Sequence, residues 1–193
     1  MAGKCEIRVL FEKPSNCNSI TAAGVCPDQP FLERSWQSVK RCFDVNVLGT
    51  YYAAQLAAKH MVSQKHDRNT TSSIVMIGSV AAHRASTGQF VSDYCSSKGA
   101  VLALVRELAV ELAQHEIRVN CISPGYIRTD MMFDIARSRP DLASILTSEP
   151  PMKRMGDRAD LKGAAVYLLS EASAYMTGGE MLVTGGLHAG RVE

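Results

Sequence analysis

A tyrosine and a lysine four residues apart are the first pair in this sequence whose types and spacing could carry out chemistry. Tyr94 and Lys98 lie in YCSSK, where a serine-rich stretch meets the apolar-periodic run GAVLALVRELAVELAQ. On the opening turn of a helix the two side chains share one face, so the ammonium can act on the phenol. Chance alone produces such a spacing in roughly one chain in four of this composition, so the surroundings must decide.

The chemistry that this pair supports is proton transfer to or from an alcohol or carbonyl oxygen. Lowering the pKa of a phenol from about 10 to near 7 requires roughly 4 kcal/mol of preference for the phenolate. An adjacent ammonium, together with a positively charged ring of a bound ligand, can supply this preference. Ser79 directly follows the apolar run IVMIG. Its hydroxyl could hydrogen-bond the substrate oxygen and hold it in place.

Each candidate residue also has a simpler interpretation. Ser79 is typical of a loop cap, and Tyr94 with Lys98 is typical of a solvated helix face. The Pro-Gly pair at 124–125 is most often only a turn, and Asn46 inside a helix normally faces water. Their joint occurrence in order, each at or beside a strand end, favours the chemical interpretation.

Alternating strands and helices are predicted along the chain. Short apolar runs bounded by Ser, Thr and Gly indicate strands, and apolar residues at three- and four-residue spacing indicate helices. The expected order is a short strand in NSITAAGV, a helix from 30 to about 64, a strand at 72–78, a helix at 92–114 that carries Tyr94, a strand in EIRVNCISPG, a helix at about 158–170 and a last strand at about 180–184. The stretch 129–155 is expected to be less regular.

This order predicts an α/β fold, with a parallel sheet, right-handed crossovers and helices on both faces. The first helix is expected to carry an apolar stripe made of Trp36, Val39, Phe43, Val47, Tyr51, Ala54 and Ala58. Ligands of such sheets bind at the carboxyl ends of the strands. We therefore expect Ser79, Tyr94 and Lys98 to converge there with the loops after the neighbouring strands.

The bulk properties describe one globular domain over residues 1–193 that takes a small ligand. The chain is 46% hydrophobic and 21% charged, with a net charge of +2. Its lysines and arginines are scattered, so no nucleic-acid or anionic membrane partner is expected. It shows neither a signal-peptide core nor a membrane-spanning run. The six cysteines are dispersed and predict no metal site and a reducing, cytoplasmic compartment.

From about Ile20 to its C-terminus the chain resembles the short-chain dehydrogenase/reductase family, especially its fungal sorbose-reductase and polyol-dehydrogenase-like members. Six segments carry the resemblance in the family's order: AAG at 22–24, FDVNVLGTYYAAQ, IVMIGSVAA, YCSSKGAV, IRVNCISPGYIRTDM and YMTGGEMLVTGG. The resemblance implies reversible hydride transfer between NAD(P)(H) and a secondary alcohol or ketone, with a sugar alcohol or ketose as the expected substrate.

The resemblance also implies a role for each candidate residue. Tyr94 would be the general acid/base, and Lys98 would lower its pKa and bind the nicotinamide ribose. Ser79 would orient the substrate oxygen, and Asn46 would hold a water in a proton relay through Lys98. The implied contacts to NAD or NADP are Gly24, Tyr94, Lys98, Pro124, Gly125, Ile127 and Thr129. The family's helices at 34–61 and 92–114 build dimers and tetramers, so a homodimer or homotetramer is expected.

The sequence departs from the family pattern at its beginning. Members of the family start with a strand, a T-G-x-x-x-G-x-G turn and a helix whose N-terminus holds the pyrophosphate. This sequence contains no such segment. We therefore expect a Rossmann-like doubly wound sheet truncated at the N-terminus, with strands 4 to 7 of the family fold and an unpaired edge at NSIT.

Three functions remain open at this point. The chain is a dehydrogenase of sugar alcohols or related carbonyl compounds, or a cofactor-deficient form without activity that at most associates with full-length relatives. The third alternative is a generic α/β domain that binds a small molecule, which leaves the ordered motifs as coincidence. Binding of the cofactor by this chain distinguishes the first alternative from the second.

Overall fold

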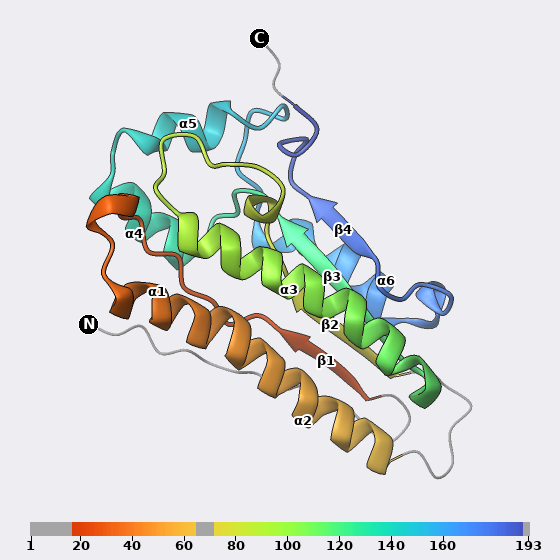
Figure 1. The fold of residues 1–193 in the computed structure, drawn as a ribbon. Helices are drawn as coiled ribbons and strands as arrows, with labels where there is room; N and C mark the ends of the chain where they lie inside the picture. Colours follow the sequence, from red (N-terminus) through yellow and green to blue (C-terminus); the bar gives the residue numbers. More distant parts are fainter. Residues whose placement is uncertain (1–16, 65–71, 191–193) are drawn as a thin grey trace.

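A computed structural model describes residues 17–64 and 72–190. It contains a parallel sheet of four strands in the order β1-β2-β3-β4 (Figure 1). The strands are β1 (Asn18–Thr21), β2 (Ser72–Ile77), β3 (Ile117–Pro124) and β4 (Glu180–Val183). The expected parallel sheet is confirmed, and its contiguous order corresponds to strands 4 to 7 of the family fold.

The central strands are buried on both faces, which explains their almost continuous apolar sequence. In β2, Ile74 and Met76 pack toward the helices on one face, whereas Val75 packs toward the opposite face. In β3, Val119 and Ile122 divide in the same way. The sheet therefore lies between two apolar layers, as the strand pattern predicted.

Helices cover both faces of this sheet (Figure 1). The helices α2 (Thr50–Ser63) and α3 (Ser92–Glu111) lie on one face, and α6 (Lys162–Leu169) lies on the other. A 3-10 turn at Ala113–His115 follows α3, and another at Arg158–Leu161 precedes α6. None of the helices in the described ranges is long and apolar enough to cross a membrane.

The single helix expected from 30 to 64 was wrong in its start and in its regularity. A 3-10 turn at Phe31–Glu33 comes first, and α1 (Trp36–Phe43) begins only after Ser35, whose hydroxyl oxygen accepts from Ser38 N. A π-helical turn at Asp44–Gly49 then separates α1 from α2. Capping at Ser35 and the wider turn around Asn46 left no break in the apolar spacing, so the pattern did not indicate them.

The expected apolar stripe on this helix was also wrong. Trp36 is 83% exposed and Tyr51 is 43% exposed. The buried residues are mostly small or polar instead, namely Cys42, Asn46, Thr50, Ala53, Ala54, Ala57 and Ala58, with Met61 at the end of α2. Trp36 and Tyr51 therefore point away from the sheet, and only Ala54 and Ala58 of the expected stripe lie in the core.

The stretch 129–155, expected to be irregular, contains two helices. They are α4 (Asp130–Ser138) and α5 (Leu142–Ser148). Thr129 caps α4 with its side chain, and Ile135, Leu142 and Leu146 pack with Val80 in a small separate core. Short helices that bury only a few apolar residues lack the repeated period on which a prediction depends.

Candidate active site

The structure brings Ser79, Tyr94 and Lys98 together, as the strand-end rule predicted. Ser79 follows β2 and caps the 3-10 turn Val80–Ala82, accepting from Ala81 N at 3.1 Å. Tyr94 lies on the first turn of α3, close enough to Ser79 for the serine side chain to lower the pKa of the phenol. The serine hydroxyl and the phenol thus meet where a substrate oxygen could contact both.

Lys98 lies one turn further along α3 and is 4% exposed. Its Nζ donates to the carbonyl of Ile77 at 2.8 Å and lies 5.7 Å from the centroid of the Tyr94 ring. Burial lowers the pKa of Lys98 to about 8. The side chain is therefore mostly charged at pH 7, and two of its three protons remain for a ligand.

The pKa of Tyr94 is raised above its ordinary value, whereas the sequence predicted that it would be lowered. Burial of the phenol raises this pKa, the thiols of Cys26, Cys42 and Cys95 add to the rise, and the hydrogen bond with Ser79 lowers it. The lysine alone does not bring the phenol near pH 7. At neutral pH Tyr94 therefore carries its proton, which suits a proton donor to a carbonyl oxygen.

Asn46 is fully buried in the π-helical turn and anchors the loop after β1. Its Oδ1 accepts from Val25 N at 2.8 Å, and its Nδ2 donates to Val25 O and to Ser97 Oγ, both at 2.9 Å. Both amide hydrogens are therefore occupied. Its main-chain carbonyl accepts from the Thr50 hydroxyl at 2.8 Å.

Gly24 lies between Asn46 and Lys98. A Cβ atom built on Gly24 would lie 3.4 Å from Asn46 Oδ1 and 3.8 Å from Lys98 Nζ. A side chain longer than alanine would therefore grow against the lysine ammonium. Glycine at this position therefore leaves room beside the ammonium on the side of the loop after β1.

The expected cofactor contacts after β3 have clear local roles. Gly125 N donates to Val183 O at 3.0 Å, and a Cβ on Gly125 would lie 2.9 Å from Thr184 Cα, so only glycine allows this approach to the end of β4. Pro124 pairs with Val183 in the β3–β4 register. These contacts fix the loop that follows at the carboxyl edge of the sheet.

Ile127 and Thr129 lie in that loop. Ile127 is buried and forms an isolated parallel bridge with Gly156. Thr129 Oγ1 accepts from Met132 N at 3.4 Å, and its hydroxyl proton remains available. The structure thus offers an apolar side chain and a donor close together in sequence, beside the same sheet edge.

Two further side chains hold the main chain of Tyr94, and sequence reasoning missed both. Asp93 Oδ1 accepts from Tyr94 N at 2.7 Å, and Ser97 Oγ donates to Tyr94 O at 2.8 Å. Ser97 lies three residues after Tyr94 on the same helix face, a spacing that could have pointed to it. Asp93 has no comparable signal, because its main partner is Arg34 from the loop after β1.

A second buried carboxylate, Glu149, lies at the end of α5. Its oxygens accept from Arg84 Nη2 at 2.6 Å, from the Thr87 hydroxyl at 2.6 Å and from the Tyr126 hydroxyl at 2.8 Å. This Glu149 cluster joins the loop after β2 to the loop after β3. Arg84 also donates to Leu187 O at 3.1 Å, which ties in the C-terminal segment.

No group of three His, Cys, Asp or Glu side chains within 17–64 and 72–190 could hold a metal ion. The five cysteines in these ranges are free thiols.

Comparison with known proteins places this site in a family. A family model described as Enoyl-(Acyl carrier protein) reductase matches residues 18–188. A short-chain type dehydrogenase/reductase from Mycobacterium marinum has a similar structure, with a TM-score of 0.80 and 38% identity over 88% of this chain and 64% of that chain. The chain belongs to the short-chain dehydrogenase/reductase family.

Relatives within the short-chain dehydrogenase/reductase family include sugar and polyol dehydrogenases. L-rhamnose 1-dehydrogenase (NAD(P)(+)) of a Sphingomonas strain is 34% identical over 169 residues, which is 88% of this chain and 64% of that protein. D-arabinitol 2-dehydrogenase [ribulose-forming] of Candida albicans is 34% identical over 168 residues, covering 86% and 58%.

Among solved structures, gluconate 5-dehydrogenase from Burkholderia cenocepacia in complex with NADP and tartrate has a TM-score of 0.79 and 28% identity, covering 89% of this chain and 64% of that one. The chain spans about three fifths of the length of the curated relatives it matches, namely 64% of the rhamnose dehydrogenase and 58% of the arabinitol dehydrogenase.

The residues of this short-chain dehydrogenase/reductase fit the nicotinamide riboside end of a dinucleotide. Gly24 leaves room beside the Lys98 ammonium, which retains protons that ribose hydroxyls could accept. The sequence holds no glycine-rich segment for the pyrophosphate.

Proposed function

We propose that the protein interconverts a secondary alcohol and a ketone of the sugar-alcohol and ketose class with NAD(P)(H). The observation that carries the proposal is the convergence of Ser79, Tyr94 and Lys98, with the Lys98 ammonium 5.7 Å from the Tyr94 ring and the Ser79 side chain near the phenol. The names of the rhamnose and arabinitol dehydrogenases support the same substrate class for this chain.

In the direction of ketone reduction, Ser79 holds the carbonyl oxygen by a hydrogen bond and Tyr94 donates its proton to that oxygen. The bound nicotinamide supplies the hydride that the carbonyl carbon accepts. The charge left on the phenolate is stabilised by Lys98. Asn46 would hold a relay water through the second lone pair of its main-chain carbonyl, which also accepts from the Thr50 hydroxyl.

Gly24, Pro124, Gly125, Ile127 and Thr129 would hold the nicotinamide end. The Thr129 hydroxyl would supply a hydrogen-bond donor there, and Ile127 would supply an apolar surface. The choice between NAD and NADP stays open, because the group that selects the adenosine 2'-phosphate belongs to the half of the fold for which the sequence shows no motif.

Cofactor titration of the purified 193-residue chain tests the proposal. Fluorescence or calorimetry with NADPH and with NADH is expected to give saturable binding, followed by turnover of D-arabinitol or a related polyol. Absence of saturable binding up to about millimolar concentration would overturn the proposal for this chain. It would favour the cofactor-deficient alternative, which predicts association with full-length relatives in a pull-down with a purified relative.

A single-atom substitution tests the acid/base role. Tyr94→Phe is expected to abolish turnover and to leave the dissociation constant of the cofactor within about threefold, because only the transferred proton is removed. Tyr175→Phe is the matched control, since Tyr175 is fully exposed, and it should keep full turnover. Unchanged turnover in Tyr94→Phe would refute the role of Tyr94.

The matching family model is described by an enoyl reduction, so the substrate panel includes an enoyl thioester. We expect polyols and ketoses to be turned over and the enoyl thioester to be inert. A hydroxyl of Ser79 beside the phenol suits an oxygen that gains a proton. Preference for the thioester would replace the substrate class while leaving the family membership intact.

Self-association through α2 and α3 forms part of the proposal. Leu48, Tyr52, Leu56 and Val110 are exposed on these helices and the preceding π-helical turn, and a 400 Å³ groove lined by both apolar and polar residues lies between α2 and α3. Burying such side chains against a second copy would remove apolar area from water. Sedimentation should show a dimer or tetramer that Leu56→Glu dissociates, and a wild-type monomer would contradict the assembly.

The free thiols support a cytoplasmic location, which the proposal also includes.

A further inference from the structure

The helix that carries Tyr94 begins without a side-chain cap. Val91 occupies the N-cap position of α3, with φ −127° and ψ 39°, and offers no acceptor to the first turn. Asp93 takes up part of that role, because its Oδ1 accepts from Tyr94 N at 2.7 Å. The backbone of Tyr94 therefore depends on a carboxylate that is only 4% exposed.

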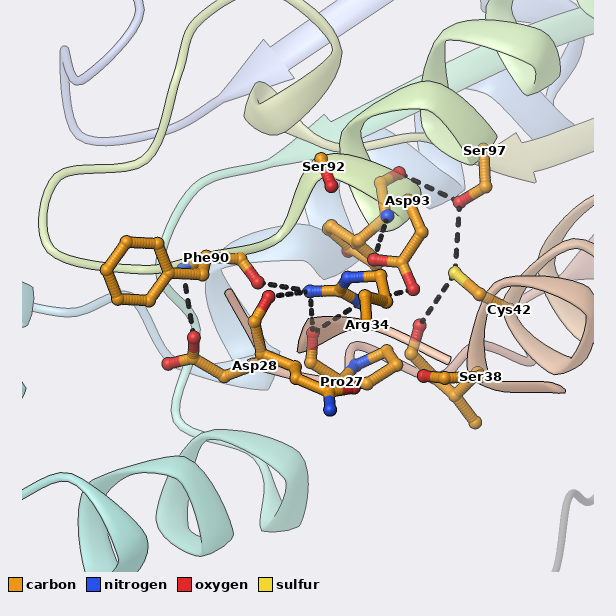
Figure 2. Close-up of polar contacts among 12 residues, drawn as sticks. Pro27, Asp28, Arg34, Ser38, Cys42, Phe90, Ser92, Asp93 and Ser97 are labelled. Atoms are coloured by element: carbon orange, nitrogen blue, oxygen red, sulfur yellow. Dashed lines mark hydrogen bonds and ion pairs between the residues drawn. The ribbon is translucent and has the colours of Figure 1, made fainter. Parts of the chain in front are cut away.

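Arg34 holds this carboxylate from a distant part of the chain (Figure 2). Its guanidinium forms an ion pair with Asp93 Oδ2, and the two side chains are 2% and 1% exposed. The remaining contacts of the guanidinium are to main-chain carbonyls, namely Gln29 O at 2.5 Å, Pro27 O at 3.4 Å and Phe90 O. One arginine thus links the loop after β1, the loop before α3 and the first turn of α3.

The ion pair between Arg34 and Asp93 contributes more to the position of the first turn of α3 than to the stability of the fold. Within the described residues, Arg34 Nε has no hydrogen-bond partner and Asp93 Oδ2 accepts no directed hydrogen bond, although the two charges are in contact. Desolvation of two such charges offsets much of their attraction, so a buried pair of this kind contributes little net stability. A function that needs a fixed first turn of α3 accounts for its place beside Tyr94.

A second link runs parallel to the first. Asn46 fixes Val25 and also donates to Ser97, whose hydroxyl donates to the carbonyl of Tyr94. The loop after β1 therefore reaches Tyr94 on both sides, through Asp93 at its N–H and through Ser97 at its carbonyl. Arg34 supplies the charge in the first link, and no part of it needs to touch a substrate.

We propose that Arg34 is a positioning residue for Tyr94, acting through Asp93. By fixing the first turn of α3, it sets the reach of the phenol toward Ser79 and the reacting oxygen. The inference rests on the proposed function, since it concerns the aim of the proton donor. Its structural part, that Arg34 holds the Tyr94 amide, stands independently of turnover.

Kinetics of Arg34→Met test the role in catalysis. A displacement of the phenol by about 1 Å is expected to lower kcat about 10- to 100-fold, whereas the KM of the substrate and the dissociation constant of the cofactor stay within about threefold. Arg34→Lys keeps the charge and should restore part of kcat. Arg106→Met is the matched control, because Arg106 is exposed on α3, and this variant should behave as the wild type.

The pH profile of alcohol oxidation separates positioning from loss of folded protein. The hydrogen bond with Ser79 lowers the pKa of Tyr94, so a displaced phenol needs a higher pH to give up its proton. The midpoint should therefore shift upward in Arg34→Met. The other groups facing the phenol, Lys98, Cys26, Cys42 and Cys95, are the same in every variant. A lower rate with an unshifted midpoint would overturn the role of Arg34.

Hydrogen exchange provides a readout that does not depend on activity. Arg34→Met should speed exchange of the Tyr94 amide at least about tenfold more than it speeds exchange in the middle of α3 around Val101, where exchange follows global stability. If the wild type binds no cofactor, the proposed function fails, and this measurement still decides whether Arg34 holds the turn. Unchanged exchange at Tyr94 would overturn the proposal.

A double variant covers the case in which Arg34→Met fails to fold. Arg34→Met with Asp93→Asn removes both charges and retains an acceptor for Tyr94 N, so the protein should fold because no unpaired charge is buried. It is expected to exchange the Tyr94 amide faster than the wild type and to lose part of kcat, because the side chain at position 93 is no longer anchored by Arg34. Asp93→Asn alone leaves the guanidinium unpaired and should match Arg34→Met. Wild-type kcat and midpoint in the double variant would contradict the proposal.

Discussion

Two buried carboxylates, Asp93 and Glu149, are each held by an arginine, and they differ in the number of side-chain donors that contact them. Among residues 17–64 and 72–190, Asp93 has a single side-chain donor, Arg34, whose other contacts are to main-chain carbonyls. Glu149 receives hydrogen bonds from Arg84 and from two hydroxyl groups. The Asp93 pair also lies deeper, because Arg84 is 22% exposed whereas Arg34 is 2% exposed.

The difference teaches that a buried charge can be robust or sensitive according to the number of its donors. The Glu149 cluster joins loops and loses only one contact when one donor is removed. The Asp93 pair fixes the residue next to Tyr94 and has no substitute when Arg34 is removed. The sensitive arrangement lies where position matters for proton transfer.

Arg34→Met should have the largest effect on stability. It leaves the carboxylate of Asp93 buried without its charged partner, and such a loss costs about 3–5 kcal/mol of unfolding free energy. Arg84→Met, with two hydroxyl donors still on Glu149, should cost only about 1–2 kcal/mol. Urea unfolding of both variants measures the contrast, and equal losses would break the comparison.

Acid should weaken the Glu149 cluster in a predictable range. Burial on its own raises the pKa of Glu149, but the hydrogen bonds from Thr87, Tyr126 and Arg84 outweigh it and lower the pKa from 4.5 to about 2. The cluster therefore stabilises the fold above pH 4.5 and loses that contribution as the pH falls toward 2. The full contribution is at most about 3 kcal/mol.

Glu149→Gln measures this contribution. At pH 6 the variant should be less stable than the wild type, and the difference in unfolding free energy should shrink as the pH falls from 4.5 toward 2. A difference that stays constant over this range would assign the effect to packing rather than to charge.

Tyr126→Phe should have a smaller effect, because it removes one of the donors and leaves Arg84 and Thr87 in place. The expected loss is about 1 kcal/mol, the usual value for one intramolecular hydrogen bond. Thermal unfolding measures it. A loss as large as that of Arg34→Met would show that the donors of Glu149 do not compensate for one another.

The smallest effect is expected at an exposed ion pair, Lys40 with Asp44 on the outside of α1. Lys40→Ala should change the unfolding free energy by at most about 0.5 kcal/mol, since solvent screens the pair. Chemical unfolding in low and high salt checks this value. A salt-independent loss above about 1 kcal/mol would mean that exposure is a poor guide to the ranking of these pairs.

The sheet could be predicted from the sequence because buried parallel strands have a local signature. The continuous apolar run before Ser79 and the run before Pro124 marked β2 and β3, and the strand-end rule then brought Ser79, Tyr94 and Lys98 together. The direction of the Tyr94 pKa could not be predicted, because it depends on how deeply surrounding elements bury the phenol. Spacing within one helix carries no information on that depth.

The residues that hold the site were less accessible to prediction. Arg34 and Asp93 meet only because the loop after β1 folds under α3, and no period or motif connects them. The prediction of an apolar stripe that includes Tyr51 failed for a related reason. Tyr51 has the spacing of a core residue, yet along most of α2 it is alanines that are buried against the sheet.

The π-helical turn at Asp44–Gly49 keeps the buried residues of α1 and α2 on one face of the continuous helix that these elements form. Buried positions recur every four residues along this helix, at Cys42, Asn46, Thr50, Ala54 and Ala58. In a regular α-helix, steps of four drift by about 40° each, whereas the wider turn winds less per residue and cancels part of that drift. Deleting one residue from Asp44–Gly49 would rotate one end by about 100° and separate the asparagine that holds the active-site loop from the alanines that hold the sheet.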